Sequence, residues 1–489
     1  MKLVSTRNNK VSMSASLATL KGIAPGGGLY VPEYFPSLNE IGDLAGVSYE
    51  KLAAKVLSLF FDDIADMELL TKKAYANFDH DERAPVKKIG DKEFVMELWH
   101  GPTLAFKDMA LSVLPRLMRA AMAKDNGKDV LILVATSGDT GKAALEGFCD
   151  VPGTRIIVFY PSEGVSDMQR LQMVTQGGGN TNVIGIKGNF DDAQTGVKQI
   201  FADSEFAQLI GDKGYRLSSA NSINFGRLAP QIAYYIWAYN ELVQREEIAQ
   251  GDKINFVVPT GNFGNILAAY YAKRMGLPIA KLICASNKNN VLTDFFNKGE
   301  YSLDRDFHKT MSPSMDILIS SNLERLLFEL VERDSDKVND MMSRLGSDSV
   351  YTIDGQAKAE LEEDFYADWC SEAETMACIN ETLRDKGYLM DTHTAVAMGV
   401  YNKYKTGGDT TKTVIVSTAS PYKFPEDVLM SLGVDSAGMS VFEMSDELSR
   451  LTGTKVPRQV AELKTKAELH TDVIEKTRLR NAVIGDISK

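Results

Sequence analysis

The sequence predicts an α/β fold in which helices cover both faces of mostly parallel sheets. Four continuous apolar runs have the length of strands that are buried on both faces, and helical segments alternate with them. These runs are 130–135, 155–160, 254–259 and 413–418. Ligands in such folds bind beyond the carboxyl ends of the strands, so the residues that follow the runs are the first candidates for a site.

Composition excludes several classes of protein. The chain has 489 residues, 44% of them hydrophobic, which is enough for several domains and a sizeable core. A formal net charge of −12 argues against a nucleic-acid partner. The four cysteines and five histidines show no CxxC or HExxH spacing, so we expect neither a disulfide framework nor a metal site. With no signal-peptide core and no apolar run of ~18 residues, we expect a cytoplasmic protein without membrane partners.

The chain is expected to divide into an N-terminal domain, a smaller α/β domain, a larger α/β domain and a C-terminal tail. Their expected ranges are 1–92, 93–225, 226–430 and 431–489. The larger domain contains a charge-rich segment at about 287–390, which we interpret as a helical insertion. In the tail, we expect a helix near 461–476.

Lys107, in the segment His100–Met109, is a candidate nucleophile. An apolar helical face follows it, so the lysine lies near a helix start, where the macrodipole disfavours its positive charge. A lowered pKa would suit a lysine that reacts as the free amine. The alternative is a solvated lysine paired with Asp108. Pro115 interrupts the helical pattern and predicts a kink near Leu111.

Two glycine-containing turns connect a predicted strand to a predicted helix. Val134–Gly141 precedes a helix at 142–148, and Pro259–Asn265 precedes one at 266–275. Backbone N–H groups at such a helix start bind anions, and the glycines of the second turn favour a nest for phosphate. The first turn is equally consistent with an ordinary helix cap. The second turn lacks the GxGxxG and Walker spacings, which weighs against NAD and ATP as the cofactor.

The lysine, the two turns and a late hydroxyl pair, Ser417–Thr418, occur in an order that resembles the fold-type II family of pyridoxal phosphate enzymes. Within that family, the chain resembles the long form of threonine synthase that is found in bacteria and fungi, over nearly its whole length. The segments that carry this closer resemblance are Ser5–Arg7, Ala24–Glu33, Phe106–Asp108, Thr136–Gly141 and Ser312–Arg325. Related dehydratases and sulfhydrylases lack the last of these. The resemblance implies two mostly parallel-sheet domains that flank a cofactor cleft, as in the tryptophan synthase β-subunit.

The resemblance also implies a reaction and its residues. Lys107 would carry pyridoxal 5'-phosphate as a Schiff base and act as the base at Cα and Cβ, while O-phospho-L-homoserine and water become L-threonine and phosphate. The other cofactor-binding residues that it implies are Asp139, Gly261, Asn262, Phe263, Gly264, Asn265 and Thr418. The substrate-binding residues that it implies are Ser137, Thr140, Asn221, Ser222 and Arg227.

Three residues, Lys142, Thr392 and Ser420, depart from the family pattern. Arg227 has a second interpretation as a surface arginine at a helix start, and His393 is expected to be a packed histidine rather than a catalytic one. Two other functions stay open, namely another fold-type II activity such as threonine dehydratase and a catalytically silent homologue. The expected assembly is a monomer or a homodimer.

Overall fold

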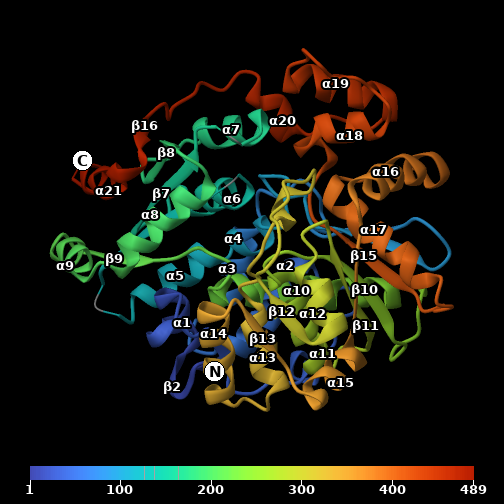
Figure 1. Cartoon of the computed structure of the whole chain (residues 1–489), viewed down its shortest axis with the longest axis horizontal. Helices are drawn as coiled ribbons and strands as arrows, with labels where there is room; N and C mark the ends of the chain where they lie inside the picture. The colour runs from blue at the N-terminus through green and yellow to red at the C-terminus, as the bar shows by residue number, and fades with distance from the viewer. Residues whose placement is uncertain (126, 137, 164, 489) are drawn as a thin grey trace.

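The computed structural model describes residues 1–125, 127–136, 138–163 and 165–488, and two large sheets dominate it (Figure 1). The strands of the six-stranded sheet, in spatial order, are β14 (Phe365–Trp369), β11 (Ile279–Ser286), β10 (Ile254–Pro259), β15 (Thr413–Ser417), β5 (Glu93–Glu97) and β4 (Val86–Lys88). The strands of the five-stranded sheet are β16 (Val473–Glu475), β8 (Thr181–Lys187), β7 (Thr154–Pro161), β6 (Asp129–Ala135) and β9 (Tyr215–Ser218). Every neighbouring pair is parallel except β4 and β5. The predicted fold class is therefore confirmed.

The five-stranded sheet is buried on both faces because successive side chains of a strand point in opposite directions. In β6, Val130, Ile132 and Val134 join one core cluster, whereas Leu131 and Leu133 join another. The helices on the first face are α5 (Leu114–Met122), α6 (Asp139–Phe148) and α7 (Asp167–Val174). The helices on the second face are α8 (Phe190–Ala202), α9 (Ser204–Asp212) and α21 (Leu479–Asp486).

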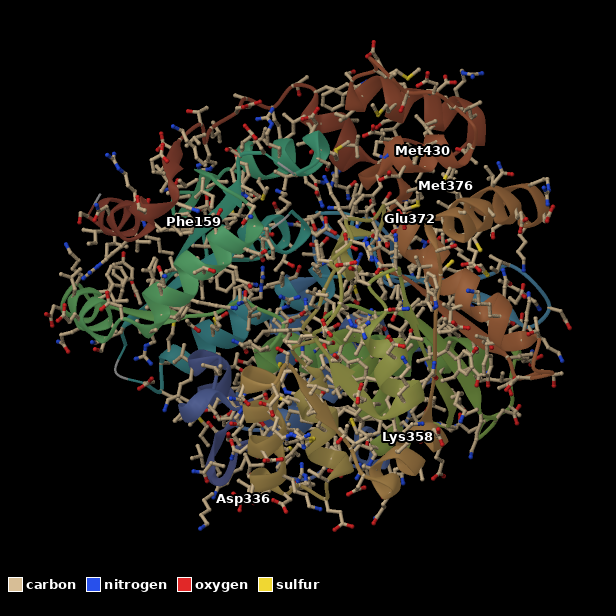
Figure 2. All side chains as sticks on the ribbon, viewed as in Figure 1. Phe159, Asp336, Lys358, Glu372, Met376 and Met430 are labelled. Atoms are coloured by element: carbon tan, nitrogen blue, oxygen red, sulfur yellow. The ribbon has the colours of Figure 1, made fainter. Side chains whose placement is uncertain are left out.

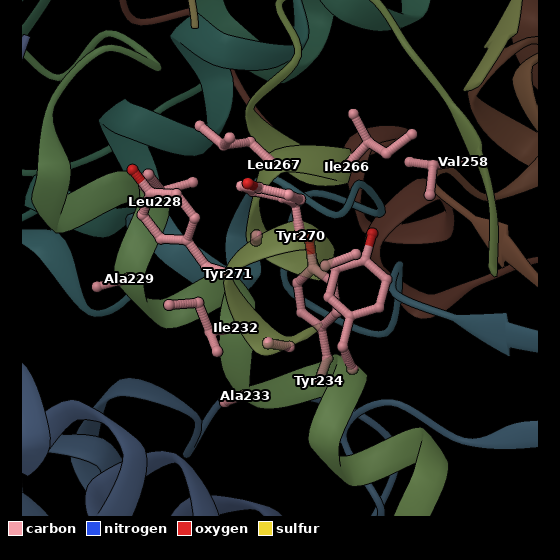
Figure 3. Close-up of a cluster of buried hydrophobic side chains, with 14 of the residues drawn as sticks. Leu228, Ala229, Ile232, Ala233, Tyr234, Val258, Ile266, Leu267, Tyr270 and Tyr271 are labelled. Carbon is pink, nitrogen blue, oxygen red and sulfur yellow. The ribbon is translucent and has the colours of Figure 1, made fainter. Parts of the chain in front are cut away.

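The six-stranded sheet is also covered on both faces. Figure 3 shows α10 (Phe225–Gln244) and α11 (Gly264–Arg274) packing together beside Val258 of β10. Val257, the next side chain along β10, belongs to the core on the opposite face. The helices of that opposite face are α16 (Glu372–Lys386), α17 (Thr392–Lys405), α18 (Pro425–Ser431), α19 (Val441–Thr452) and α20 (Arg458–Leu463).

The N-terminal part packs on the α10 side of the large sheet. Its elements are the antiparallel strands β1 (Lys2–Ser5), β2 (Asn8–Ser14) and β3 (Tyr30–Pro32) and the helices α1 (Ala15–Lys21), α2 (Tyr49–Phe60) and α3 (Met67–Ala74). The segment that we expected as a helical insertion contains α12 (Val291–Lys298), β12 (Glu300–Ser302), α13 (Leu323–Leu330), α14 (Ser335–Ser347), β13 (Val350–Thr352) and α15 (Gly355–Asp364). It also supplies β14, so it extends the large sheet. Asp336 of α14 and Lys358 of α15 lie near the rim of this part in Figure 2.

The predicted helix near 461–476 is wrong. Helix α20 ends at Leu463, and Val473–Glu475 forms β16 in parallel register with Gly185–Lys187 of β8. The exposed edge of β8 offers unpaired backbone groups, and this long-range pairing outweighs the local helical pattern. In Figure 1 the C-terminal segment crosses from α19 to the edge of the five-stranded sheet. Within the described residues, no helix combines the length and the apolar character that a membrane crossing requires.

Candidate active site

Three loops meet at the carboxyl edge of the large sheet. Strands β10, β15 and β5 are parallel neighbours, so the segments that follow them leave from the same edge. Lys107 lies in the loop after β5, at the N-cap of the short helix α4 (Asp108–Leu111). The loop is fixed to the end of β15, because the Phe106 N–H donates to the Thr418 carbonyl at 2.8 Å. The predicted kink is also present, since α4 ends at Leu111 before α5 begins.

Asp108 does not pair with Lys107. Its buried carboxylate accepts hydrogen bonds from the Thr103 N–H at 2.8 Å and from the Thr103 hydroxyl at 2.6 Å. Burial raises the pKa of Asp108 to about 6. The carboxylate therefore holds the turn before the lysine, and Lys107 faces other groups.

Lys107 faces Asp139 and Ser314. Its Nζ lies 3.6 Å from Asp139 Oδ2 and 3.3 Å from Ser314 Oγ, and the Ser314 hydroxyl donates to the same carboxylate oxygen at 3.2 Å. Burial lowers the pKa of Lys107; Asp139 opposes this effect, and Arg227 and Lys423 add to it. The net direction suits a lysine that reacts as a free amine.

Asp139 remains ionised despite its burial. Burial alone would raise its pKa, but the positive charges of Lys423 and Lys107 outweigh burial and hold the pKa well below the usual range. Lys423 Nζ lies 3.0 Å from Asp139 Oδ1, and the Gln169 side-chain amide donates to the same oxygen at 3.0 Å. A buried acid between two lysines is thus the electrostatic centre of the site.

The Gly/Asn turn after β10 leaves its backbone available at the start of α11. The N–H groups of residues 261–265 donate to no acceptor among the described residues. The side-chain Oδ1 of Asn265 accepts from the Tyr234 and Tyr235 hydroxyls, while its buried Nδ2 has no partner within the described part of the chain. Phe263 adopts the left-handed conformation (φ = 62°) that turns the chain into the helix. These donors form an uncharged cradle suited to a phosphate group.

The segment Ser312–Arg325 packs directly against this cradle. A Cβ at Gly261 would lie 2.8 Å from the Ser314 carbonyl oxygen, so only glycine fits this approach. The Asn262 carbonyl accepts from the Asn322 N–H at 3.1 Å and from its side-chain amide at 2.8 Å. The other face of the segment is held by His393, whose Nε2 accepts the Ser314 N–H at 3.1 Å. His393 is buried and also bonded to Asp391, so it is a packed histidine that positions Ser314.

Arg227 is buried near the start of α10, which excludes its interpretation as a surface arginine. Its side chain donates to the Ala220 carbonyl at 2.8 Å, and its Nε has no partner among the described residues. Burial lowers the pKa of Arg227 to about 10. In the preceding turn, Asn221 is exposed and Ser222 is half-buried, with its hydroxyl accepting from the Asn322 side chain at 3.3 Å.

In the Ser/Thr-rich turn after β6, a side chain of the turn itself accepts two of the backbone N–H groups. The Thr136 hydroxyl accepts the N–H groups of Gly138 and Gly141, each at 3.0 Å. Thr140 is half-buried in the first turn of α6, which starts at Asp139 rather than at the predicted 142. Ser137, a predicted substrate-binding residue, lies outside the described residues.

The Ser417 and Thr418 hydroxyls differ in their surroundings. Ser417 Oγ accepts from Trp99 Nε1 and from the Thr394 hydroxyl, each at 3.0 Å. Thr418 is buried as a residue, and its side-chain hydroxyl makes no hydrogen bond to another described residue. Thr418 is therefore the hydroxyl that is available to a ligand.

Sequence reasoning assigned no role to Lys423, Ser314, Thr136 or Gln169. Lys423 follows Ser420, one of the residues noted as a departure, and Ser314 lies inside a segment quoted for its resemblance. Lys423 lies between two aromatic residues, Tyr422 and Phe424, just beyond a predicted buried strand, and this pattern could have identified it.

Together these groups fit pyridoxal phosphate. A buried lysine with a lowered pKa meets the requirement for an amine that attacks an aldehyde. The free backbone N–H groups of residues 261–265 and the unpartnered Asn265 amide supply the hydrogen-bond donors that a phosphate group requires. Among the described residues, no cluster of ligating side chains would hold a metal ion.

Comparisons with family models cover most of the chain. Residues 2–75 match the threonine synthase N terminus, 82–357 match the pyridoxal-phosphate dependent enzyme family, and 394–474 match the threonine synthase C-terminal model.

Individual relatives agree with these matches. Human threonine synthase-like 1 is 42% identical over 86% of this chain, which spans only 58% of that longer protein. Threonine synthase from Pseudomonas aeruginosa is 38% identical over 96% of this chain and 98% of its own. A pyridoxal phosphate-bound threonine synthase from Brucella melitensis has a TM-score of 0.89 at 37% identity, with full coverage of both chains. The yeast enzyme has a TM-score of 0.87 at 31% identity and covers 100% of this chain and 99% of its own. The chain therefore belongs to the threonine synthase family of pyridoxal phosphate-dependent enzymes.

Proposed function

We propose that the protein converts O-phospho-L-homoserine and water into L-threonine and phosphate. The observation that carries the proposal is Arg227, a buried guanidinium that is 3% exposed and has an Nε without a partner in the described chain. It lies close enough to Lys107 to lower the pKa of that lysine. A phosphorylated substrate requires an anion site in addition to the cofactor cradle at 261–265, and arginine matches the geometry of phosphate oxygens.

The cofactor side of the site is assigned as follows. Lys107 would hold pyridoxal phosphate covalently, and residues 261–265 would hold its phosphate group. The Thr418 hydroxyl would face the pyridine nitrogen, and Asp139 would lie near the ring oxygen. When bound, the cofactor withdraws electrons from the substrate Cα and so acidifies the protons near it.

The chain's own groups would then bind and move protons. Freed Lys107 would act as the base that removes a proton at Cα and later one at Cβ, because a buried neutral amine can accept them. Arg227, Asn221 and Ser222 would hold the phosphate at Cγ as it leaves, and water would add at Cβ. Thr140 and Ser137 would supply hydroxyls on the substrate side. Local cations are needed here because the overall charge of −12 repels an anionic substrate.

The decisive assay follows phosphate and threonine after the purified protein is mixed with pyridoxal phosphate and O-phospho-L-homoserine. Release of both in equal amounts supports the proposal. Ammonia and a keto acid from threonine would instead indicate a dehydratase. A protein that binds the cofactor on Lys107 yet turns over neither substrate would be a silent homologue.

Arg227→Lys tests the phosphate assignment directly. Lysine keeps the charge but loses the forked geometry, so we expect KM for the substrate to rise about 10- to 100-fold with a smaller change in kcat. The cofactor affinity should stay unchanged, and a loss of cofactor affinity instead would contradict the assignment. A cytoplasmic location and a monomeric or homodimeric state also belong to this proposal, and cell fractionation and light scattering test them.

A further inference from the structure

Lys423 is a second buried lysine at the site, and its ammonium group is fully engaged. Its Nζ donates to the Thr103 carbonyl at 2.9 Å and to Gln172 Oε1 at 3.0 Å, and it lies 3.0 Å from Asp139 Oδ1. A lysine ammonium has three N–H donors, so each one has an acceptor. The side chain is fully buried, and these three contacts hold it in place. Lys423 is therefore a fixed positive charge.

The two lysines divide the Asp139 carboxylate between them. Lys423 contacts Oδ1 at 3.0 Å, whereas Lys107 lies farther away, at 3.6 Å from Oδ2, and shares that oxygen with the Ser314 hydroxyl. In a buried site, an unpaired carboxylate would strongly favour the ammonium form of Lys107. The closer pairing with Lys423 removes much of this attraction.

We propose that Lys423 is a positioning residue that neutralises Asp139 and so allows Lys107 to reach the neutral amine form that captures the cofactor. In that step the Lys107 nitrogen forms a bond to the aldehyde carbon, and the carbonyl oxygen leaves as water. One proton of that water comes from the amine and the other from the medium, so the product is the protonated Schiff base. The inference rests on the role that the proposed function gives to Lys107. It needs no assumption about the amino-acid substrate.

The titratable groups that face Lys107 and Asp139 come from several elements. Lys107 is faced by Asp139 of α6, by Arg227 of α10 and by Lys423 of the turn Pro421–Lys423. Asp139 is also faced by His393 of α17. Replacing Lys423 with a neutral residue removes one cation near Lys107 and frees the carboxylate. Both changes favour the ammonium form, so the pH at which Lys107 becomes reactive must rise.

Lys423 also interacts electrostatically with Asp108. The buried carboxylate of Asp108 senses the Lys423 charge, and it shares with Lys423 the residue Thr103 as a hydrogen-bonding partner. Loss of the lysine therefore also affects the turn before Lys107, and the test needs a variant that keeps the charge.

The experiment measures how fast the full-length chain, freed of cofactor, captures added pyridoxal phosphate across a range of pH. Borohydride trapping and peptide mass spectrometry count the adduct on Lys107. For Lys423→Met we expect the midpoint of the rate profile to rise by about one pH unit or more, which is about a tenfold slower capture near neutral pH. Lys423→Arg keeps the charge and should stay close to the wild-type midpoint.

The matched control is Lys142→Met. Lys142 is another buried lysine in the same helix as Asp139, but it pairs with Glu146 at 3.1 Å and with Gln176. Its loss should leave the midpoint unchanged. An unshifted midpoint in a folded Lys423→Met protein, or an equal shift in the control, would overturn the inference.

A second variant covers the case in which Lys423→Met does not fold. Asp139→Asn removes the carboxylate but leaves Arg227 and Lys423 facing Lys107, so the midpoint must fall. A raised or unchanged midpoint would contradict the charge argument. The capture experiment contains no phosphorylated amino acid, so it does not depend on the proposed substrate. If cofactor capture shows the expected pH dependence but the loaded protein does not turn over O-phospho-L-homoserine, the proposed function fails and this inference stands.

Discussion

The turns that begin α6 and α11 each connect a buried parallel strand to a helix, yet they offer opposite chemistry. In the first, the Thr136 hydroxyl accepts two of the turn's N–H groups, and Asp139 places a buried negative charge at the helix start. In the second, the N–H groups of residues 261–265 have no acceptor among the described residues, and the turn contains no acid. A phosphate fits only the second. The first instead organises the charge around Lys107.

The largest effect is expected at Lys107, which faces Asp139 of the first turn and contacts Ser314, whose carbonyl packs on Gly261 of the second. Lys107→Ala removes both the proposed attachment point and the proposed base, so kcat for threonine formation should fall by at least about 10³-fold. Borohydride should trap no cofactor on the variant protein. Lys142→Met is the matched control and should retain both activity and trapping. A Lys107→Ala protein with near wild-type activity would contradict the proposed mechanism.

Gly261→Ala tests the second turn alone. The added Cβ would lie 2.8 Å from the Ser314 carbonyl oxygen and 3.2 Å from the Met315 Cα, so the turn or its neighbour must move. Such overpacking costs about 1–3 kcal/mol, and we expect pyridoxal phosphate to bind about 10- to 100-fold more weakly. Spectroscopic titration measures the Kd. Gly346→Ala is the control, because a Cβ there meets no atom within 4 Å; equal losses in both variants would show that the cradle is not at 261–265.

The sequence predicted the elements that local patterns determine and missed those that distant contacts determine. The apolar runs gave the strands β6, β7, β10 and β15 within a residue at either end, because burial on both faces demands such runs. Strand β16 was missed because its three residues pair only with a distant sheet edge.

The same distinction holds in the site. Lys107 and the Gly/Asn turn are recognisable from nearby residues. Lys423 and Ser314 contact Asp139, which is more than 170 residues away from each. Their partners depend on how the loops assemble, and single-sequence patterns do not encode that assembly.

Thr136→Val tests the first turn. The substitution preserves shape but removes the acceptor of two buried N–H groups, so the free energy of unfolding should fall by about 1–2 kcal/mol. Denaturant titration measures it. Thr19→Val is the matched control, because the Thr19 hydroxyl is buried with no partner in the described chain, and its loss should cost little. Cofactor affinity should change less than in Gly261→Ala, and a larger change would mean that the first turn also holds the phosphate.

The smallest effect is expected at Ser314, which joins the two turns. Its carbonyl packs on Gly261, and its hydroxyl donates to Asp139 at 3.2 Å and lies 3.3 Å from Lys107 Nζ. Ser314→Ala removes the hydroxyl but keeps the backbone bond to His393. Losing one hydrogen bond to a charged group costs about 1 kcal/mol where other donors remain. If this cost falls on the transition state, kcat should fall about fivefold. Steady-state kinetics should show this change in kcat with an unaltered cofactor Kd. A drop in kcat as large as that of Lys107→Ala would mean that the Ser314 hydroxyl itself transfers a proton, and the comparison of the two turns would then have to include a third reacting group.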